Sequence, residues 1–310
     1  MHIDKGLSQL PMQERRPNRT AETENFPVAS LLIARDLRPA VKAYYAMARA
    51  ADDVADDDGL SAEAKIQLLD CIETALSDGA GYVATARSSA VDDRRDAVCA
   101  AAKARRILAE RKLPMEHATR LLVAFRRDAV QPRIATWAEL MDYCADSAAP
   151  VGRFLLDLHG ETADGYPASD ALCTALQVLN HLQDCADDYR RLNRIYLPAD
   201  WLAEEGVPET DLAAARSSPG LRRVLDRCLN EIADLLARAR PLPQRMRSVR
   251  LALETAVVVT LAEALARRLA ALDPLAARVH VSKPAMLALA GIAVSRFLLH
   301  RMANPVSRRA

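Results

Sequence analysis

Two clusters of aspartate lie far apart in the sequence, each in a stretch whose composition predicts a helix. The first contains Asp52, Asp53 and Asp56, and the second contains Asp184 and Asp188. Each cluster has two carboxylates spaced four residues apart, which places them on one helix face, where like charges destabilise an isolated helix. Mg²⁺ would relieve this repulsion, because it takes carboxylate oxygens and completes its coordination shell with substrate phosphates.

The residues ahead of the first cluster extend this chemistry. Arg49 lies three residues before Asp52, and Tyr45 lies four before Arg49, so that all three share one side of the expected helix. A guanidinium beside a metal-binding acidic face can take the diphosphate oxygens that the metal leaves uncovered. The pattern therefore favours a diphosphate as the ligand.

The second cluster repeats the arrangement along its own helix. Asn180, Asp184 and then Asp187 or Asp188 follow one face, and Asn180 and Gln183 can add oxygen ligands or hydrogen bonds. Either cluster alone is typical of a solvated helix face. Two facing clusters would border a cavity with apolar walls. Such a cavity suits a reaction in which departing diphosphate leaves a carbocation that must be kept from water and that aromatic faces can stabilise.

The composition predicts a helical protein. The chain has 310 residues, of which 51% are hydrophobic, 27% charged and only 4% aromatic, with just 10 glycines. A net charge of +1 gives no positive electrostatic field that would attract nucleic acid, so nucleic acid is excluded as a partner. The six cysteines include no CxxC pair, so neither a zinc site nor a disulfide framework is indicated.

The elements that must position these residues are helices throughout. We expect them over residues 31–54, 61–76, 92–108, 114–130, 136–143, 150–158, 169–192, 221–239, 249–272 and from 282 onward. No break between them is long enough for an inter-domain linker. We therefore expect a polar, mobile N-terminal tail over residues 1–22 and one all-α domain over residues 23–310.

The ends of the chain indicate where the protein resides. No signal peptide opens it, and the apolar run over residues 284–294 is interrupted at Arg296, which makes it too short to span a bilayer. We expect a soluble, cytoplasmic protein. Arg296, Arg301, Arg308 and Arg309 can bring it to the periphery of the inner membrane through contacts with anionic lipid.

The two clusters and their flanking residues resemble the squalene and phytoene synthase family. Tyr45 and Arg49 precede the first motif, and the segment 194–198, which includes Tyr196, follows the second. The similarity runs from about residue 24 to residue 283. It implies a single-domain isoprenoid synthase fold, a helical bundle around a central cavity. It also implies chemistry on prenyl diphosphates with several Mg²⁺ ions.

The resemblance assigns roles to individual residues. As Mg²⁺ ligands it implies Asp52, Asp53, Asp56, Asn180, Asp184 and Asp188. As catalytic residues it implies Tyr45, Arg49, Tyr143 and Tyr196. As substrate contacts it implies Asn25, Phe26, Gly152, Arg153, Gln183 and Arg278.

Finer features are similar to the hydroxysqualene synthase branch of bacterial hopanoid pathways. These features are the segment 24–30, Arg153 and the segment 183–191. Other branches often carry a basic or small polar residue at the position of Glu24 and an arginine at the position of Gln183. This branch ionises presqualene diphosphate and quenches the cation with water, without NADPH, and it works beside other enzymes of the squalene pathway. Two alternatives stay open. One is head-to-head condensation of two prenyl diphosphates to presqualene diphosphate, squalene or phytoene, and the other is a non-catalytic helical scaffold.

Overall fold

The structure, a computed structural model, describes residues 33–78 and 95–303. The predictions for the tail over residues 1–22 and for Asn25 and Phe26 lie outside these ranges. The longer helices are α1 (Arg38–Ala55), α2 (Ala62–Asp78), α5 (Arg95–Glu110), α6 (Glu116–Val130), α7 (Trp137–Ser147), α8 (Ala149–Leu158), α9 (Tyr166–Asp187), α11 (Pro219–Ala239), α13 (Val249–Ala271) and α14 (Lys283–Ala303). The shorter ones are η1 (Ala163–Gly165), the π-helix η2 (Asp188–Leu192), α10 (Ala199–Glu204), η3 (Glu209–Ala213) and α12 (Leu242–Arg245).

The all-α prediction is confirmed. In the described part of the chain the only extended pairing is an isolated bridge between Arg133 and Ile195. Several helices begin where the sequence predicts, because a side chain caps the first turn. Ser61 accepts a hydrogen bond from the Ala64 amide, and Thr136 accepts one from the Glu139 amide. Such caps satisfy amides that have no partner inside the helix.

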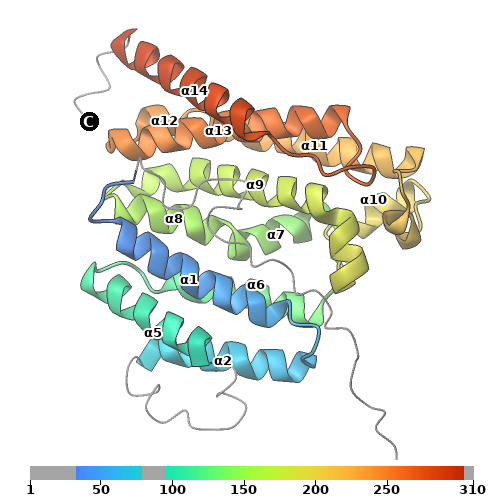
Figure 1. Cartoon of the computed structure of the whole chain (residues 1–310), viewed down its shortest axis with the longest axis horizontal. Coiled ribbons are helices and arrows are strands. Elements are labelled where there is room, and N and C mark those ends of the chain that lie inside the picture. The colour runs from blue at the N-terminus through green and yellow to red at the C-terminus, as the bar shows by residue number, and fades with distance from the viewer. Residues whose placement is uncertain (1–32, 79–94, 304–310) are drawn as a thin grey trace, which may run out of the picture.

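The long helices are stacked with their axes roughly parallel (Figure 1). At one side α1, α2, α5 and α6 enclose a core that contains Met47, Leu69 and Leu122, and Phe154 reaches into it from α8. The middle helices α7 and α9 pack with α11 and α13 around a second core. α14 covers the outer side of α13. Most of the predicted site residues therefore lie on or next to the packed helices α1, α7, α8 and α9.

Gly152 lets α8 approach α9 closely. A Cβ atom at this position would lie 2.3 Å from the Ser169 hydroxyl oxygen and 2.6 Å from the Cys173 sulfur. The chain is also bent at Ala148, between α7 and α8, where the backbone leaves helical geometry. Gly152 therefore serves packing between the two helices, and its contact with substrate stays a prediction.

α14 corrects one expectation. It is 21 residues long with a mean hydropathy of 1.4 in its most apolar window, so by length and composition it could cross a membrane. The prediction that the C-terminal apolar run is too short was wrong, because Arg296 lies inside the helix instead of ending it. Only 11% of that window is buried, so most of α14 lies on the surface of the fold.

Candidate active site

The first acidic cluster, Asp52, Asp53 and Asp56, occupies the end of α1. Arg49 donates to both of its neighbours on the helix, with Nη1 2.7 Å from Asp52 Oδ2 and Nη2 2.5 Å from Asp53 Oδ1. The predicted placement of Arg49 on the carboxylate face is confirmed. Its guanidinium offsets the repulsion that the sequence pattern implied.

The carboxylates of this cluster remain crowded despite Arg49. Partial burial and the nearby charge of Asp56 raise the pKa of Asp52 to about 7, although Arg49 acts in the opposite direction. Burial is the larger cause of this shift, and the negative charges of nearby carboxylates add to it. A bound divalent cation would offset both effects and favour the ionised form of Asp52.

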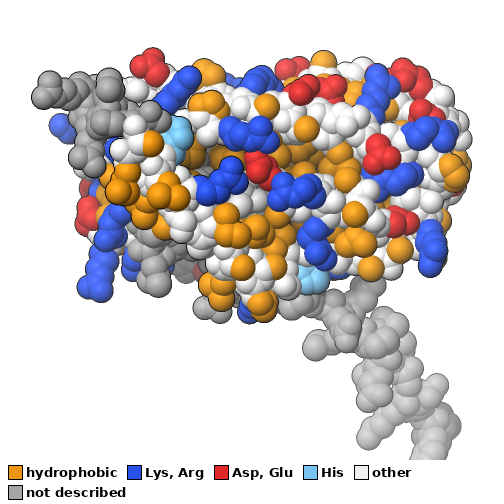
Figure 2. Space-filling view, turned by 90° about the horizontal axis from the view of Figure 1, so that it is seen from above, with side chains coloured by type: hydrophobic (Ala, Val, Ile, Leu, Met, Phe, Trp, Pro, Cys, Tyr) orange, Lys and Arg blue, Asp and Glu red, His pale blue; other side chains and the backbone are white. Residues whose placement is uncertain are grey.

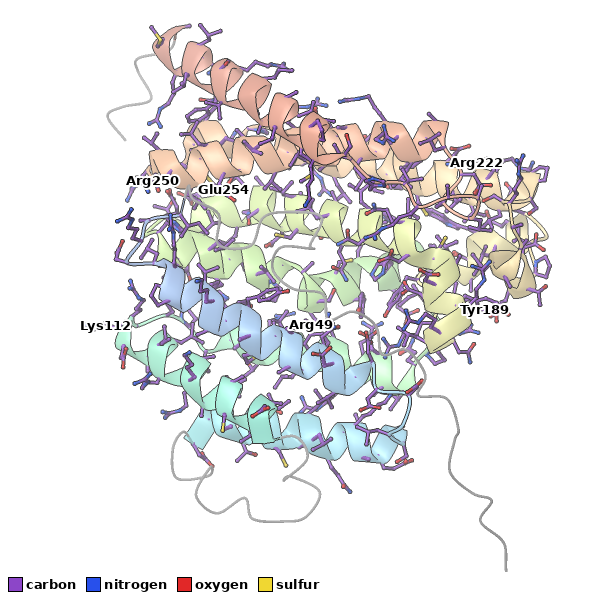
Figure 3. All side chains as sticks on the ribbon, viewed as in Figure 1. Arg49, Lys112, Tyr189, Arg222, Arg250 and Glu254 are labelled. Carbon is purple, nitrogen blue, oxygen red and sulfur yellow. The ribbon has the colours of Figure 1, made fainter. Side chains whose placement is uncertain are left out.

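The second acidic cluster, Asn180, Asp184 and Asp188, lies where α9 passes into the π-helix η2. Asn193 then takes a left-handed conformation, with φ of 51°, and ends the helical run. Figures 1 and 3 show α1 and α9 running in the same direction toward one end of the molecule, where η2, marked by Tyr189, turns toward the end of α1. The fold thus brings both clusters to the same end.

Arg194 joins the two acidic regions. It follows the second cluster directly, and its side chain is only 7% exposed. Its Nη1 lies 2.5 Å from Asp56 Oδ1 and its Nη2 donates to the Ala55 carbonyl at 2.8 Å. Its Nε donates to the Asp128 carbonyl on α6 at 3.1 Å. One guanidinium therefore fixes the ends of α1 and α6 against the segment that leaves η2.

Asp128 holds two of the predicted catalytic tyrosines. The Tyr143 hydroxyl donates to one carboxylate oxygen at 2.9 Å, and the Tyr196 hydroxyl donates to the other at 2.8 Å. Burial raises the pKa of Asp128 to about 6, although Arg194 and the two hydroxyls stabilise its charge. The shared carboxylate fixes the orientation of both aromatic rings, whose centroids lie 5.4 Å apart.

His181 completes this aromatic group. Its ring stacks on Tyr196 with centroids 3.7 Å apart and lies 5.9 Å from the Tyr143 ring. Burial and the charge of Arg194 lower the pKa of His181 to about 3, so it is neutral near pH 7. Three rings without positive charge therefore lie beside the second acidic cluster.

A polar cleft of about 280 Å³ opens beside Arg194. It is lined by Asp56, Asp58, Lys65, Asp128, Ala129, Val130, Pro132, Arg191, Leu192 and Arg194. The apolar cavity expected between the two clusters stays a prediction.

No role for Asp128 or Arg194 was predicted from the sequence. Arg194 belongs to the segment 194–198 that carries part of the family resemblance, so its position gave a signal. Asp128 follows two arginines at a helix end and resembles an exposed charge.

Gln183, a predicted substrate residue, contacts the segment that carries a second one, Arg278. The Gln183 side chain is buried and its amide donates to the Val279 carbonyl at 2.5 Å. This bond draws the segment that carries the exposed Arg278 against the second acidic cluster. Tyr45 lies half-buried on α1, one turn before Arg49. Substrate contact by these residues stays a prediction.

Arg153 lies farther away. Its guanidinium forms a bidentate pair with Asp170 at 3.0 and 2.6 Å and stacks over the Tyr166 ring. Asp170 precedes Asp184 by 14 residues on α9, which corresponds to roughly 20 Å along the helix axis. The structure therefore separates Arg153 from the acidic end and uses it to hold α8 on α9.

The donor set fits a hard divalent cation. The two clusters supply five carboxylates and one amide, which are oxygen donors of the kind that Mg²⁺ takes. Within residues 33–78 and 95–303, no three Asp, Glu, His or Cys side chains are grouped closely enough to hold a metal by themselves. Each cluster therefore fits a metal ion whose remaining ligands come from a phosphate group and water.

A helical bundle with two acidic helix ends at one side fits the isoprenoid synthase fold that the sequence resemblance implies. The family model for squalene/phytoene synthase matches residues 20–285. The chain is 41% identical to a hydroxysqualene synthase of Rhodopseudomonas palustris over 300 residues, covering 96% of this chain and 97% of the relative. It is 40% identical to one of Zymomonas mobilis, with 88% of each chain covered. The chain therefore belongs to the squalene/phytoene synthase family and is an enzyme of isoprenoid synthesis.

Solved structures agree with this assignment. The squalene synthase HpnC from Alicyclobacillus acidocaldarius superposes with a TM-score of 0.65 at 33% identity, covering 81% of this chain and 89% of the other. A dehydrosqualene synthase gives a TM-score of 0.69 at 21% identity, covering 89% and 92%. The second likeness concerns the fold alone.

Proposed function

We propose that this protein converts presqualene diphosphate and water to hydroxysqualene and diphosphate with Mg²⁺. The observation that carries the proposal is the identity of 40–41% to hydroxysqualene synthases over nearly the whole chain. The site geometry supports it, because both acidic clusters lie at the end toward which α1 and α9 run.

The acidic clusters and Arg49 would receive the diphosphate. Asp52, Asp53 and Asp56 would hold Mg²⁺ from α1, and the second cluster would hold it from α9. The ions would neutralise the leaving group. Arg49 pairs with two aspartates; with Mg²⁺ held by those carboxylates, its guanidinium would be able to bind phosphate oxygens.

The aromatic group would protect the carbocation. Tyr143, Tyr196 and His181 form a group of aromatic rings beside the second cluster, and the rings themselves carry no positive charge near pH 7. π faces attract cations, whereas an imidazolium would repel one. Asp128 fixes the two tyrosine hydroxyls, which keeps the rings in place while the carbon skeleton rearranges.

The proposed reaction needs no reductant. A carbon–oxygen bond to diphosphate breaks, a carbon–oxygen bond to water forms, and the proton that water loses leaves with diphosphate. Carbon is neither oxidised nor reduced in this balance. We therefore propose that the protein works without NADPH.

The test uses the purified protein with Mg²⁺ and presqualene diphosphate, without NADPH, and identifies the lipid product by mass spectrometry. Hydroxysqualene is expected, and Asp52→Ala and Asp188→Ala should each lower the rate at least about 100-fold, as expected when stabilisation of the leaving group is lost. Asp142→Ala, an exposed change on α7, is the matched control. Full activity of both site variants would contradict the role proposed for the two acidic clusters.

Condensation is the second candidate. Phytoene synthases of Thermus thermophilus and Rhodobacter capsulatus are 29% and 31% identical over 66% and 69% of this chain. If farnesyl or geranylgeranyl diphosphate is condensed and presqualene diphosphate alone is left unchanged, this candidate replaces the first.

A further inference from the structure

α14 exposes a continuous apolar stripe. Leu287, Ile292, Leu298, Leu299 and Met302 are large apolar residues that are between 46% and 76% exposed. At 3.6 residues per turn these positions fall within about 140° of one helix face. Figure 2 views the molecule from the side on which α14 lies in Figure 1, and apolar side chains reach the surface there. Single apolar residues are normally scattered over a protein surface, whereas these five form one contiguous apolar surface.

The borders of the stripe are basic. Arg296 lies at one edge of the apolar face, and Lys283 and Arg301 lie at the other, while the sequence of α14 contains no Asp or Glu. The opposite face is anchored in the fold. Ala293 packs with Leu261 of α13, and Phe297 enters a cluster with residues of α12 and α13.

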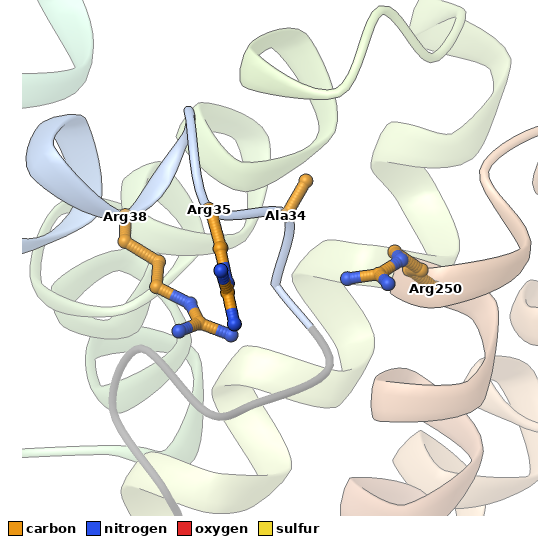
Figure 4. A pocket seen from close by; sticks show the side chains of 4 residues that line it. All are labelled: Ala34, Arg35, Arg38 and Arg250. Atoms are coloured by element: carbon orange, nitrogen blue, oxygen red, sulfur yellow. The ribbon is translucent and has the colours of Figure 1, made fainter.

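A basic cleft lies at the same end of the molecule. A cavity of about 440 Å³ is lined by Ala34, Arg35, Arg38 and Arg250 (Figure 4). Arg250 precedes Leu251, which packs with Phe297 of α14. The cleft is therefore close to the C-terminal half of α14. It lies at the N-terminal end of α1, away from the acidic clusters (Figure 3).

We propose that α14 docks this protein onto the surface of an anionic lipid bilayer. The apolar stripe would enter the boundary between headgroups and acyl chains, and its basic borders would meet the phosphates. Arg35, Arg38 and Arg250 would bind a lipid phosphate beside the helix. This inference stands on surface chemistry and does not depend on which diphosphate the enzyme converts.

The helix lies in the plane of the membrane in this arrangement. Spanning the bilayer would require α14 to leave α13 and expose Phe297 and Leu261. It would also carry Arg296 and Arg301 into the hydrocarbon. Docking in the plane keeps the packed face on the protein and the charged borders at the headgroups.

The test is sedimentation of the whole protein with two kinds of vesicle. One is pure phosphatidylcholine, and the other contains 30% phosphatidylglycerol, an amount chosen to give about the charge of an anionic leaflet. Binding to the second is expected, with at least tenfold weaker partitioning for the double variant Leu287→Glu/Leu299→Glu. Val123→Glu introduces one such charge at an exposed apolar position on α6 and should bind as the wild type does.

A second pair of variants tests the basic cleft. Arg35→Gln/Arg250→Gln should lose most of the preference for phosphatidylglycerol, whereas Arg106→Gln, an exposed change on α5, should keep it. Circular dichroism and melting temperature check the fold of each variant.

Three outcomes would overturn the proposal. The first is an absence of wild-type binding to either vesicle, and the second is equal binding by the glutamate double variant. The third is a wild-type dimer in light scattering that the double variant converts to monomers, with no vesicle binding, because a second copy then covers the stripe.

Discussion

Arg194 contacts backbone and side-chain oxygens from two other helices, and its substitution is expected to lower the free energy of unfolding. Arg194→Met takes away the donor to Asp56, to the Ala55 carbonyl and to the Asp128 carbonyl. Breaking a buried pair by removing one partner destabilises a protein by about 3–5 kcal/mol. We expect a loss of this size in urea unfolding followed by circular dichroism. Arg191→Met, which changes an exposed neighbour, should differ from the wild type by less than about 0.5 kcal/mol.

Sequence reasoning found the residues of the site that come in helical patterns. The pairing of Arg49 with Asp52 could be predicted, because residues three apart share a helix face. The pairing of Arg194 with Asp56 could not, since it joins positions 138 residues apart. For the same reason nothing in the segment around Asp128 indicates that two distant tyrosines donate to it.

Gly152 fixes the distance between α8 and α9. Gly152→Ala places a methyl group against Ser169 and Cys173, and overpacking of this kind costs about 1–3 kcal/mol. Thermal unfolding should show the loss, and adding Ser169→Ala and Cys173→Ala should recover part of it. Gly291→Ala on α14 meets no atom within 4 Å. It should be neutral or slightly stabilising, because alanine favours the helix, and an equal loss there would contradict this explanation.

Asp273 gives the loop after α13 a pH-dependent stability. Burial opposes its charge, but hydrogen bonds from Ser217 and Leu275 outweigh burial and lower the pKa of Asp273 below its usual value. The folded state therefore binds this proton less readily than the unfolded chain. The resulting stability is full above the unfolded pKa of about 4 and is lost as pH falls through the folded pKa.

Asp273→Asn should consequently destabilise the protein by about 1–3 kcal/mol at pH 7, because charged hydrogen bonds are lost. The difference from the wild type should shrink as pH is lowered below about 4. Urea unfolding at a series of pH values measures it, with the exposed change Asp234→Asn as control. A difference that is constant across pH would refute the argument.

The helices themselves were largely predictable, because their apolar periodicity and caps are local. The helix expected over residues 249–272 occurs as Val249–Ala271, and the one expected over 221–239 occurs as Pro219–Ala239. The π-helix at 188–192 was not foreseen, since periodicity does not reveal where a helix widens. The sequence also could not show that α14 lies on the surface, because this depends on which helices pack beside it.

At the scale of the whole molecule, we expect Mg²⁺ and diphosphate to bind together. Because no described group of three ligands is preformed, we expect phosphate oxygens, together with water, to complete each metal shell. Inorganic diphosphate with Mg²⁺ should raise the melting temperature by about 5 °C at saturation. Either component alone should raise it far less. Asp52→Ala/Asp184→Ala should abolish the joint effect and Asp142→Asn should keep it; a full shift with Mg²⁺ alone would argue for a preformed metal site.

The bond between Arg194 and Asp56 has a consequence for the order in which the protein forms during synthesis. Asp56 leaves the ribosome well before Arg194, and 138 positions separate them. The helices α1, α2, α5 and α6 can gather early around their shared core, since their contacts are closer in sequence. The acidic end of α1 can pair with Arg194 only after η2 and the segment that follows it have been synthesised. Catalytic competence therefore arrives late, after much of the nascent chain can already have folded.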